Sequence, residues 1–162
     1  MATTLHRFKP RYRGLAWSAV CVGAGLAGMA TLIGFVALPL ATGIVGVALG
    51  ATYLLSPTWR LAVTVDDDGL TVGSPDRQRF RLPWGDVVKV IAAPSTNTCF
   101  VDGGAPERSL LVPGVGAPAP YDLEDRPALV AAILAHVDPA RVERVESIEA
   151  AKAAAAAEKN TK

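Results

Sequence analysis

The hydrophobic and polar positions divide the chain into an uncharged stretch and a region in which apolar and polar residues alternate. Residues 14–59 contain no Lys, Arg, Asp or Glu. A helix that spans a membrane needs roughly 20 mostly apolar residues, so this stretch is long enough for two spans and a tight turn. We therefore predict a transmembrane helical hairpin, with spans over residues 14–35 and 38–56.

A cleaved signal peptide is the competing interpretation of the first span, because a basic arm precedes the apolar run. The apolar core of a signal peptide is about 7–15 residues long and ends at a cleavage site. Here the apolar run continues past Gly34 and Pro39, which suit a turn and the start of a second helix. This continuation favours two spans.

Small residues recur at a spacing of four in both predicted spans. Gly23 and Ala27 lie in the first span, and Gly46 and Gly50 lie in the second. Small residues let helix backbones approach closely, which stabilises helix packing in lipid. We predict that these residues pack the two helices of the hairpin together, and the alternative is packing between two copies of the chain. The spans contain no charged residue to carry protons or ions, which disfavours a channel or transporter.

Positive charge flanks the uncharged stretch on both sides. Residues 1–13 carry four Lys or Arg and no acid, and Arg60 follows the second span. Positive residues next to a span stay on the cytoplasmic side of the membrane. We predict a multi-pass protein with cytoplasmic N- and C-termini. Residues 1–13 then form a basic arm, which either binds the anionic leaflet or is an unstructured tail.

From Arg60 onward the apolar period changes to two, which is typical of half-buried strands. Six strands are predicted, within residues 60–66, 70–72, 77–82, 86–92, 96–102 and 107–112, and a short seventh falls near residues 120–123. Short strands separated by regular turns favour an antiparallel barrel or sandwich. The predicted fold class is thus membrane-anchored α+β, with this β domain over residues 60–137.

Two helices are predicted after the strands. The first has Asp122 or Asp125 as its cap, and its apolar face closes one end of the barrel. That face consists of Leu129, Val130, Ile133, Leu134 and Val137. Residues 138–162 form a second, Ala-rich helix, which docks at its start and frays at its end because its apolar stripe stops at Ile148.

Composition argues against several classes of function. Residues 60–162 hold twelve of the 16 Lys and Arg and all 15 acids, a net charge of −3, which disfavours nucleic-acid binding. The cysteines, Cys21 and Cys99, lie in regions predicted to be in lipid and in water, so a disulfide between them is implausible. No catalytic, nucleotide-binding or metal-ligand motif is present. We predict no enzyme activity, no cofactor and no metal.

Three arginines are the candidate contact residues. Arg77, Arg79 and Arg81 alternate with core positions Phe80 and Leu82, so they are predicted to line one outward strand face. This arginine row either contacts lipid head groups or an acidic protein partner, or it is a solvated face balanced by nearby acids. The other polar features have structural interpretations. They are an exposed turn at Asp66–Asp68, packing by Trp84, a cap or turn at Asp86 and a surface position for His136.

The strand region carries a family resemblance. Val63-x-Val65-x-x-x-Gly69-Leu70-x-Val72 is followed by Arg79-x-Arg81-Leu82-Pro83-Trp84-x-Asp86-Val87-x-x-Val90. With the hairpin before it and the helix after it, this pattern resembles the bacterial pleckstrin-homology-like (PH-like) membrane proteins, over about residues 60–137. The resemblance implies a bent antiparallel barrel capped by the C-terminal helix, and a place in the bacterial inner membrane.

Two departures from that family limit what the resemblance implies. Six strands are clear, whereas the family fold has seven. The first turn is acidic at Asp66–Asp68, where phosphoinositide-binding domains place basic residues, so phosphoinositide binding is not expected.

Two functions follow from the sequence. The first is a non-catalytic binding module, held at the cytoplasmic leaflet, that engages a protein partner or lipid head groups. The alternative is a structural subunit that forms a homo-oligomer or joins a larger membrane complex through its small-residue helix faces.

Overall fold

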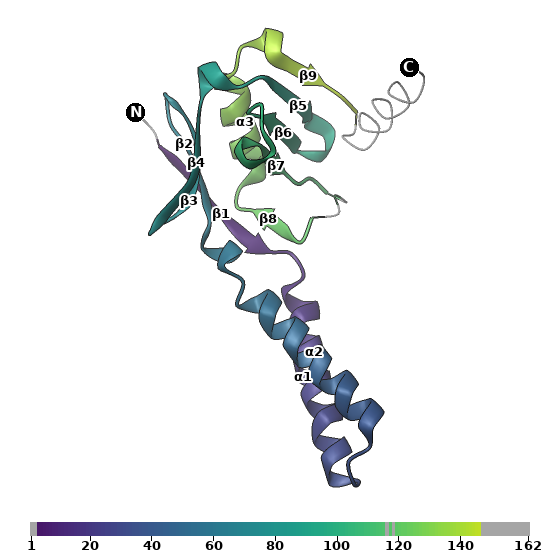
Figure 1. Cartoon of the computed structure of the whole chain (residues 1–162). Helices are drawn as coiled ribbons and strands as arrows, with labels where there is room; N and C mark the ends of the chain where they lie inside the picture. Colours follow the sequence, from purple (N-terminus) through teal and green to yellow (C-terminus); the bar gives the residue numbers. More distant parts are fainter. Residues whose placement is uncertain (1–2, 116, 118, 147–162) are drawn as a thin grey trace, which may run out of the picture. The chain divides into compact units, whose positions relative to one another are not determined.

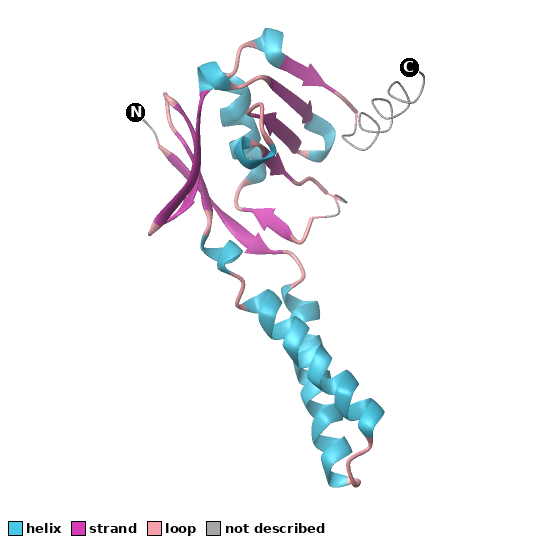
Figure 2. Cartoon of the chain, viewed as in Figure 1, coloured by secondary structure: helices cyan, strands magenta, loops and turns pink. Residues whose placement is uncertain are grey.

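The computed structural model describes residues 3–115, 117 and 119–146 (Figure 1). The chain forms two compact units. One unit is Pro10–Trp59, and the other combines the N-terminal segment up to Lys9 with the chain from Arg60 onward. Figure 2 shows that the first unit is helical and that the second holds the strands, so the protein is α+β.

The helical unit contains α1 (Arg13–Leu32) and α2 (Ala37–Leu54), followed by the 3-10 turn η1 (Pro57–Arg60). Both helices are long and apolar enough to cross a membrane. The connection between them turns through left-handed backbone angles, with φ of 114° at Gly34 and 59° at Phe35. Glycine adopts such angles without strain, which explains the turn at Gly34.

The two helices pack with their backbones in contact. A Cβ atom placed on Gly23 would lie 2.6 Å from the carbonyl oxygen of Gly43, and one placed on Gly50 would lie 2.7 Å from that of Ala16. Only glycine allows this approach, so the hairpin depends on the small residues of both helices.

The strand unit contains nine strands in two sheets among its described residues. The five-stranded sheet has the order β4 (Arg77–Pro83), β3 (Gly69–Ser74), β2 (Ala62–Val65), β1 (Thr4–Pro10) and β8 (Tyr121–Leu123). The four-stranded sheet has the order β7 (Leu110–Val112), β6 (Thr98–Asp102), β5 (Lys89–Ala93) and β9 (Val142–Arg144). Short 3-10 turns lie at η2 (Trp84–Asp86), η3 (Pro94–Thr96), η4 (Pro106–Arg108) and η5 (Pro139–Arg141).

Of the barrel and the sandwich expected from the sequence, the closed barrel is wrong, because the strands form two separate sheets. The α3 helix (Arg126–His136) supplies the apolar face that the sequence predicts, and that face packs into a core shared with strands of both sheets. The fully buried members of this core include Val63, Leu82, Val90, Val101, Leu129 and Ile133. The sequence therefore locates the core residues correctly, although it misses how the sheets close around them.

The basic arm predicted for residues 1–13 is largely the strand β1. Its residues Thr4 to Arg7 pair in antiparallel register with Val65 to Ala62 of β2. The N–H of Phe8 extends this pairing by donating to Leu61 O at 3.0 Å. Neither a free arm nor an unstructured tail describes this segment. The strand unit also begins earlier than residue 60, and the whole helical hairpin lies between two neighbouring strands of one sheet.

The helix predicted to restart at Asp138 is also wrong for the described part of that segment. Asp138 caps only the short turn η5, by accepting the N–H of Ala140, and β9 follows in parallel register with β5. The N–H of Val145 donates to Ala92 O at 2.9 Å, so pairing with β5 replaces local helix formation. Residues 147–162 of the predicted Ala-rich helix lie outside the described residues.

We expect Gly23→Ala to destabilise the packing of α1 on α2, because its new methyl group would meet the Gly43 carbonyl oxygen at 2.6 Å. Overpacking of this kind costs about 1–3 kcal/mol. Gly25→Ala is the matched control, since nothing lies within 4 Å of a Cβ atom there. Thermal unfolding of the full chain in mild detergent should give a lower midpoint for Gly23→Ala alone. Equal midpoints for the two variants would contradict the close packing.

Candidate functional site

The arginine row lies on β4, an outer strand of the five-stranded sheet (Figure 1). Its three side chains are exposed. The pairing of β4 with β3 shifts register between Val72 and Gly73. Val72 pairs with Phe80, and Gly73 pairs with Gln78. Arg79, which lies between these two β4 residues, therefore has no partner on β3. Arg79 is therefore the extra residue of a β-bulge.

The bulge places Arg77 and Arg81 on opposite faces of the sheet. Arg81 pairs with Thr71, and Arg77 pairs with Ser74. Cross-strand partners share a face, and positions an odd number of residues apart on β3 point to opposite faces. Arg77 thus shares the core side of the sheet with Val72, and Arg81 lies on the outer side. The single row predicted from the alternation is wrong because one extra residue reverses the period.

Arg81 has an acidic neighbour, and this fits the solvated-face interpretation. Its guanidinium Nη2 lies 3.6 Å from Oδ2 of Asp68, and both side chains are largely exposed. Exposed pairs of this kind contribute little to stability, but they do neutralise local charge. Neither Arg77 nor Arg79 forms an ion pair with any residue of the described chain.

Arg79 acts instead on Tyr121 of β8. Burial raises the pKa of Tyr121, and the positive charge of Arg79 partly opposes this increase. The Tyr121 ring packs on Phe8 with the ring centroids 5.1 Å apart, and its hydroxyl donates to Leu111 O at 2.9 Å. Tyr121 thus connects the two sheets.

The five-stranded sheet has one basic end and one acidic end. At one end of the sheet β1 stops and β2 starts. The cross-strand neighbours near this end, from β1 to β4, are Arg7, Ala62, Gly73 and Gln78. We call this the crossing end, because the chain leaves it for α1 and returns to it from α2. Its cations include Arg7, Lys9, Arg60, Arg77 and Arg79, and its acids include Asp76, Asp122 and Glu124.

The opposite end of this sheet carries the turn Asp66–Asp68. The carboxylate of Asp66 accepts the N–H groups of Asp68 at 3.0 Å and Gly69 at 2.8 Å, and the Trp84 indole donates to Asp66 O at 3.0 Å. These bonds close the turn on itself, which confirms the interpretation as a turn. Two of the three carboxylates remain largely exposed to solvent.

His136 and Trp84 form a stacked pair beside that turn. Their ring centroids are 5.2 Å apart, with an interplanar angle of 17°. His136 Nδ1 lies 2.8 Å from Ala132 O, and its Nε2 lies 3.7 Å from a carboxylate oxygen of Asp67. The packing role predicted for Trp84 is confirmed. The simple surface position predicted for His136 is incomplete, because this ring also covers the indole.

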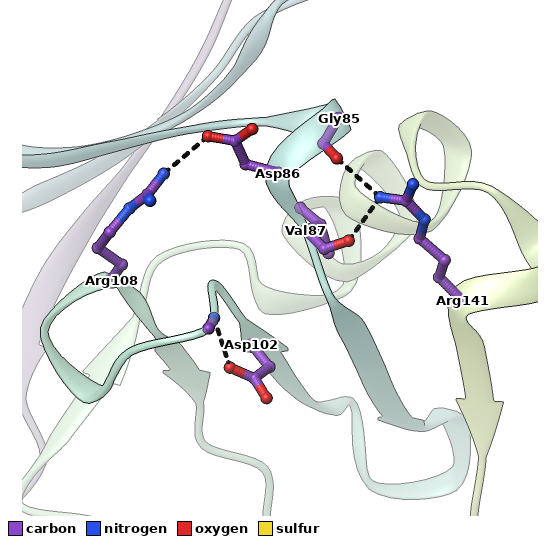
Figure 3. Close-up of polar contacts among 7 residues, drawn as sticks. Gly85, Asp86, Val87, Asp102, Arg108 and Arg141 are labelled. Atoms are coloured by element: carbon purple, nitrogen blue, oxygen red, sulfur yellow. Dashed lines mark hydrogen bonds and ion pairs between the residues drawn. The ribbon is translucent and has the colours of Figure 1, made fainter.

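The remaining charged side chains near η2 hold the backbone in place (Figure 3). Arg108 pairs with Asp86 at 2.9 Å, which links η4 to η2. Arg141 donates to the carbonyl oxygens of Gly85 at 2.9 Å and Val87 at 2.6 Å, and so anchors the start of β9. These contacts explain the role of Asp86 as structural.

The sequence analysis missed His6, which β1 buries to an exposed fraction of 4%. Its Nδ1 lies 2.9 Å from Glu124 O, and a carbonyl oxygen only accepts, so Nδ1 carries the hydrogen. Its Nε2 is buried and has no hydrogen-bond partner within the described residues. The alternation of His6 and Phe8 with exposed Leu5, Arg7 and Lys9 is the only sequence signal for this strand.

The thiol of Cys99 is buried, and the described residues form no metal cluster. Burial raises the pKa of the Cys99 thiol to about 12, so this thiol stays protonated and unreactive near neutral pH. No group of three or more His, Cys, Asp or Glu side chains comes together within the described chain to hold a metal ion. The polar clusters described above are instead built around backbone groups.

The candidate packing residues lie in the helical unit, at the contact between α1 and α2. Cβ atoms placed on Gly23 and Gly46 would approach backbone oxygens of the opposite helix, and Ala27 lies against Gly43. Gly50 is buried in the same way. These four positions therefore lie at the contact between the two helices of the hairpin. A second series of small residues faces away from α2 on α1, and it consists of Gly14, Ser18, Cys21, Gly25 and Gly28.

Comparison with protein-family models, with curated proteins and with solved structures gives no match to this chain. The PH-like resemblance therefore stays a prediction that depends on the short motif quoted above.

The pair of Lys9 and Glu124 should make stability depend on pH. The hydrogen bond and charge of Lys9, which lies 2.8 Å from the carboxylate, lower the pKa of Glu124 below its ordinary value of 4.5. A carboxyl group whose pKa is lower in the folded than in the unfolded protein stabilises the fold at pH values above its unfolded-state pKa. This contribution is lost as the pH falls through its folded-state pKa. Below about pH 4.5, the melting temperature of wild type should fall more steeply than that of Lys9→Met.

Melting temperatures measured at a series of pH values test this expectation. Arg144→Met, which removes an exposed cation at the far edge of the other sheet, is the control and should keep the wild-type slope. Parallel curves for wild type and Lys9→Met would show that the pair does not perturb Glu124.

Proposed function

We propose that this protein is a non-catalytic binding module with a PH-like fold, held at the cytoplasmic leaflet of a bacterial inner membrane by a two-helix hairpin. The observation that carries the proposal is the position of the hairpin between β1 and β2 of one sheet. The strand unit is thus tied to the candidate spans by two chain connections, which suits a domain that works at the membrane surface.

The charge pattern supports an orientation with the strand unit in the cytoplasm. Arg11 and Arg13 precede or open α1, Arg60 ends η1, and the turn between the helices carries no charge. Positive residues that flank a span are retained on the cytoplasmic side. Both ends of the hairpin therefore belong on that side, and so does the unit that they join.

Aromatic residues at the base of the helical unit support the same placement. The rings of Tyr53 and Trp59 lie 5.0 Å apart, and the Trp59 indole donates to the carbonyl oxygen of Tyr53. The Tyr53 hydroxyl accepts the N–H of Tyr12 at 3.0 Å. Aromatic side chains of this kind gather at the level of lipid head groups.

A binding role is supported by how the polar side chains are used. The contacts of Asp86, Arg108 and Arg141 stabilise the backbone, and the thiol of Cys99 is buried. The crossing end, by contrast, has exposed cations that form no ion pair within the described residues, namely Arg60, Arg77 and Arg79. A module that binds through charge is therefore the function that this surface fits best.

The topology can be tested by labelling single cysteines in a Cys21→Ser background. Cysteines at Thr3 and Glu146 should be protected from a membrane-impermeant maleimide in intact cells, whereas a cysteine at Phe35, in the exposed turn, should react. Permeabilised cells provide the control, because all three sites should then react. Labelling of either end in intact cells would overturn the proposed orientation.

The second candidate, a structural subunit, is favoured by one observation. The outward series of small residues on α1 stays exposed after α1 and α2 have packed. Such a series suits close packing against another helix in lipid. Gly23, Ala27, Gly46 and Gly50 are already used within the hairpin, so this candidate depends on the outward series instead.

Cys21 lies in the middle of that outward series and provides a direct test. If the series forms an interface between two copies, mild oxidation in native membranes should give a disulfide-linked dimer, and Gly25→Ile with Gly28→Ile should abolish it. A cysteine at Ile44, which is exposed on α2, should not crosslink in the Cys21→Ser background. A chain that stays monomeric under these conditions would eliminate the candidate.

A further inference from the structure

We propose that the crossing end of the five-stranded sheet binds the anionic phospholipid head groups of the leaflet that holds the hairpin, with Arg77 and Arg79 as the main contacts. This inference rests on the proposed function, because it requires the hairpin to lie in a membrane. It replaces the row of three arginines with a site of two arginines, and it names the partner of that site.

Arg77 and Arg79 lie toward the end of the sheet that the chain connects most directly to the hairpin. The pair Ser74–Arg77 lies one step beyond the row that contains Arg7 and Ala62, at the end where β1 stops and β2 starts. Only a few residues of chain separate this end from the first residue of α1 and the last residue of α2. Any other end of the strand unit is connected to the spans through at least one whole strand.

Several cations of the crossing end have no acidic partner within the described residues. Arg60, Arg77 and Arg79 have no ion-pair partner in the described residues, whereas Arg81 lies beside Asp68. Asp76 is the remaining acid in the β3–β4 turn, and Glu124 is already paired with Lys9. The field of an anionic leaflet extends about 8–10 Å at physiological salt, and it attracts cations at this range.

The opposite end of the sheet carries negative charge. The turn Asp66–Asp68 presents exposed carboxylates there, beside the row that pairs Thr4 with Val65. An anionic surface repels that end and attracts the crossing end. The sheet is therefore polarised in the direction that favours one orientation on an anionic leaflet.

An acidic protein segment is the competing partner, and two observations disfavour it. Strand addition at β4 is hindered by the bulge at Arg79 and by Pro83, which are features that protect sheet edges. A protein interface also needs a buried apolar centre. The large apolar side chains that are exposed in the described part of this unit are Leu5, Val88 and Val115, and none of them belongs to β4 or to the turn before it.

The experiment uses the full chain in nanodiscs, with a fluorophore on a single cysteine in the Cys21→Ser background. One label replaces Pro75, in the exposed β3–β4 turn, and the other replaces Gly85, near the acidic end, where nothing lies within 4 Å of a Cβ atom. Cys99 is buried and stays unlabelled. Lipids with a spin label on the head group quench a fluorophore that lies close to them.

The label at Pro75 should be quenched more in an equal mixture of phosphatidylcholine and phosphatidylglycerol than in phosphatidylcholine alone. Each cation near an anionic leaflet raises the ratio of docked to undocked molecules about five-fold. Removing two of them, in Arg77→Gln with Arg79→Gln, should therefore lower this ratio about 25-fold. The difference between the two lipid mixtures should then disappear, and it should also shrink in high salt. Quenching of the label at Gly85 should change neither with the lipid mixture nor with the arginine substitutions.

Arg81→Gln is the matched control, because it removes the same charge from the same strand but from a side chain beside Asp68. Equal quenching of the Pro75 label in both lipid mixtures would overturn the lipid site. So would an Arg81→Gln variant that loses the difference between the mixtures as fully as Arg77→Gln with Arg79→Gln. Quenching that appears only when native membrane proteins are present would assign the two arginines to a protein partner instead and would also overturn it. Failure of the chain to enter nanodiscs at all would contradict the proposed function, which separates the two outcomes.

Discussion

The structure of the strand unit depends on the antiparallel pairing of β1 with β2. This pairing brings Thr4 opposite Val65, although the whole helical hairpin lies between them in sequence. It also brings His6 and Phe8 into the core and gives β8 a strand to lie beside. Without β1, the five-stranded sheet would lose a central strand, and Tyr121 would lose the ring on which it packs. The hairpin is therefore a long insertion into a sheet rather than an anchor fused to the start of a domain.

The same pairing determines where charge lies. Because β1 ends and β2 begins at one end of the sheet, the cations next to the hairpin gather there with those of β4. The turns at the other end collect the aspartates, and their carboxylates accept backbone N–H groups or lie beside Arg81 and His136. A near-neutral chain, with a formal net charge of +1, is thus strongly polarised along the sheet.

Local patterns in the sequence predict the elements that local forces determine. The uncharged stretch predicts two helices, the small residues predict their contact, and the alternation after Arg60 locates most strands to within a few residues. Long-range pairing is what the sequence does not reveal. Phe8 alone cannot establish an apolar period for β1, Val142 pairs with β5 rather than continuing a helix, and the bulge at Arg79 is invisible in a regular alternation. The alternation therefore placed the three arginines on one strand, but it gave the wrong faces for them.

The order of synthesis gives the β1–β2 pairing a further consequence. The strand β1 leaves the ribosome first, and its partner follows only after α1 and α2 have been made. At about 5–20 residues per second, several seconds separate the two strands. The sheet cannot close until both helices and β2 have been made, so β1 stays without its partner strand throughout that time. Completion of the strand unit therefore has to follow synthesis of the whole hairpin.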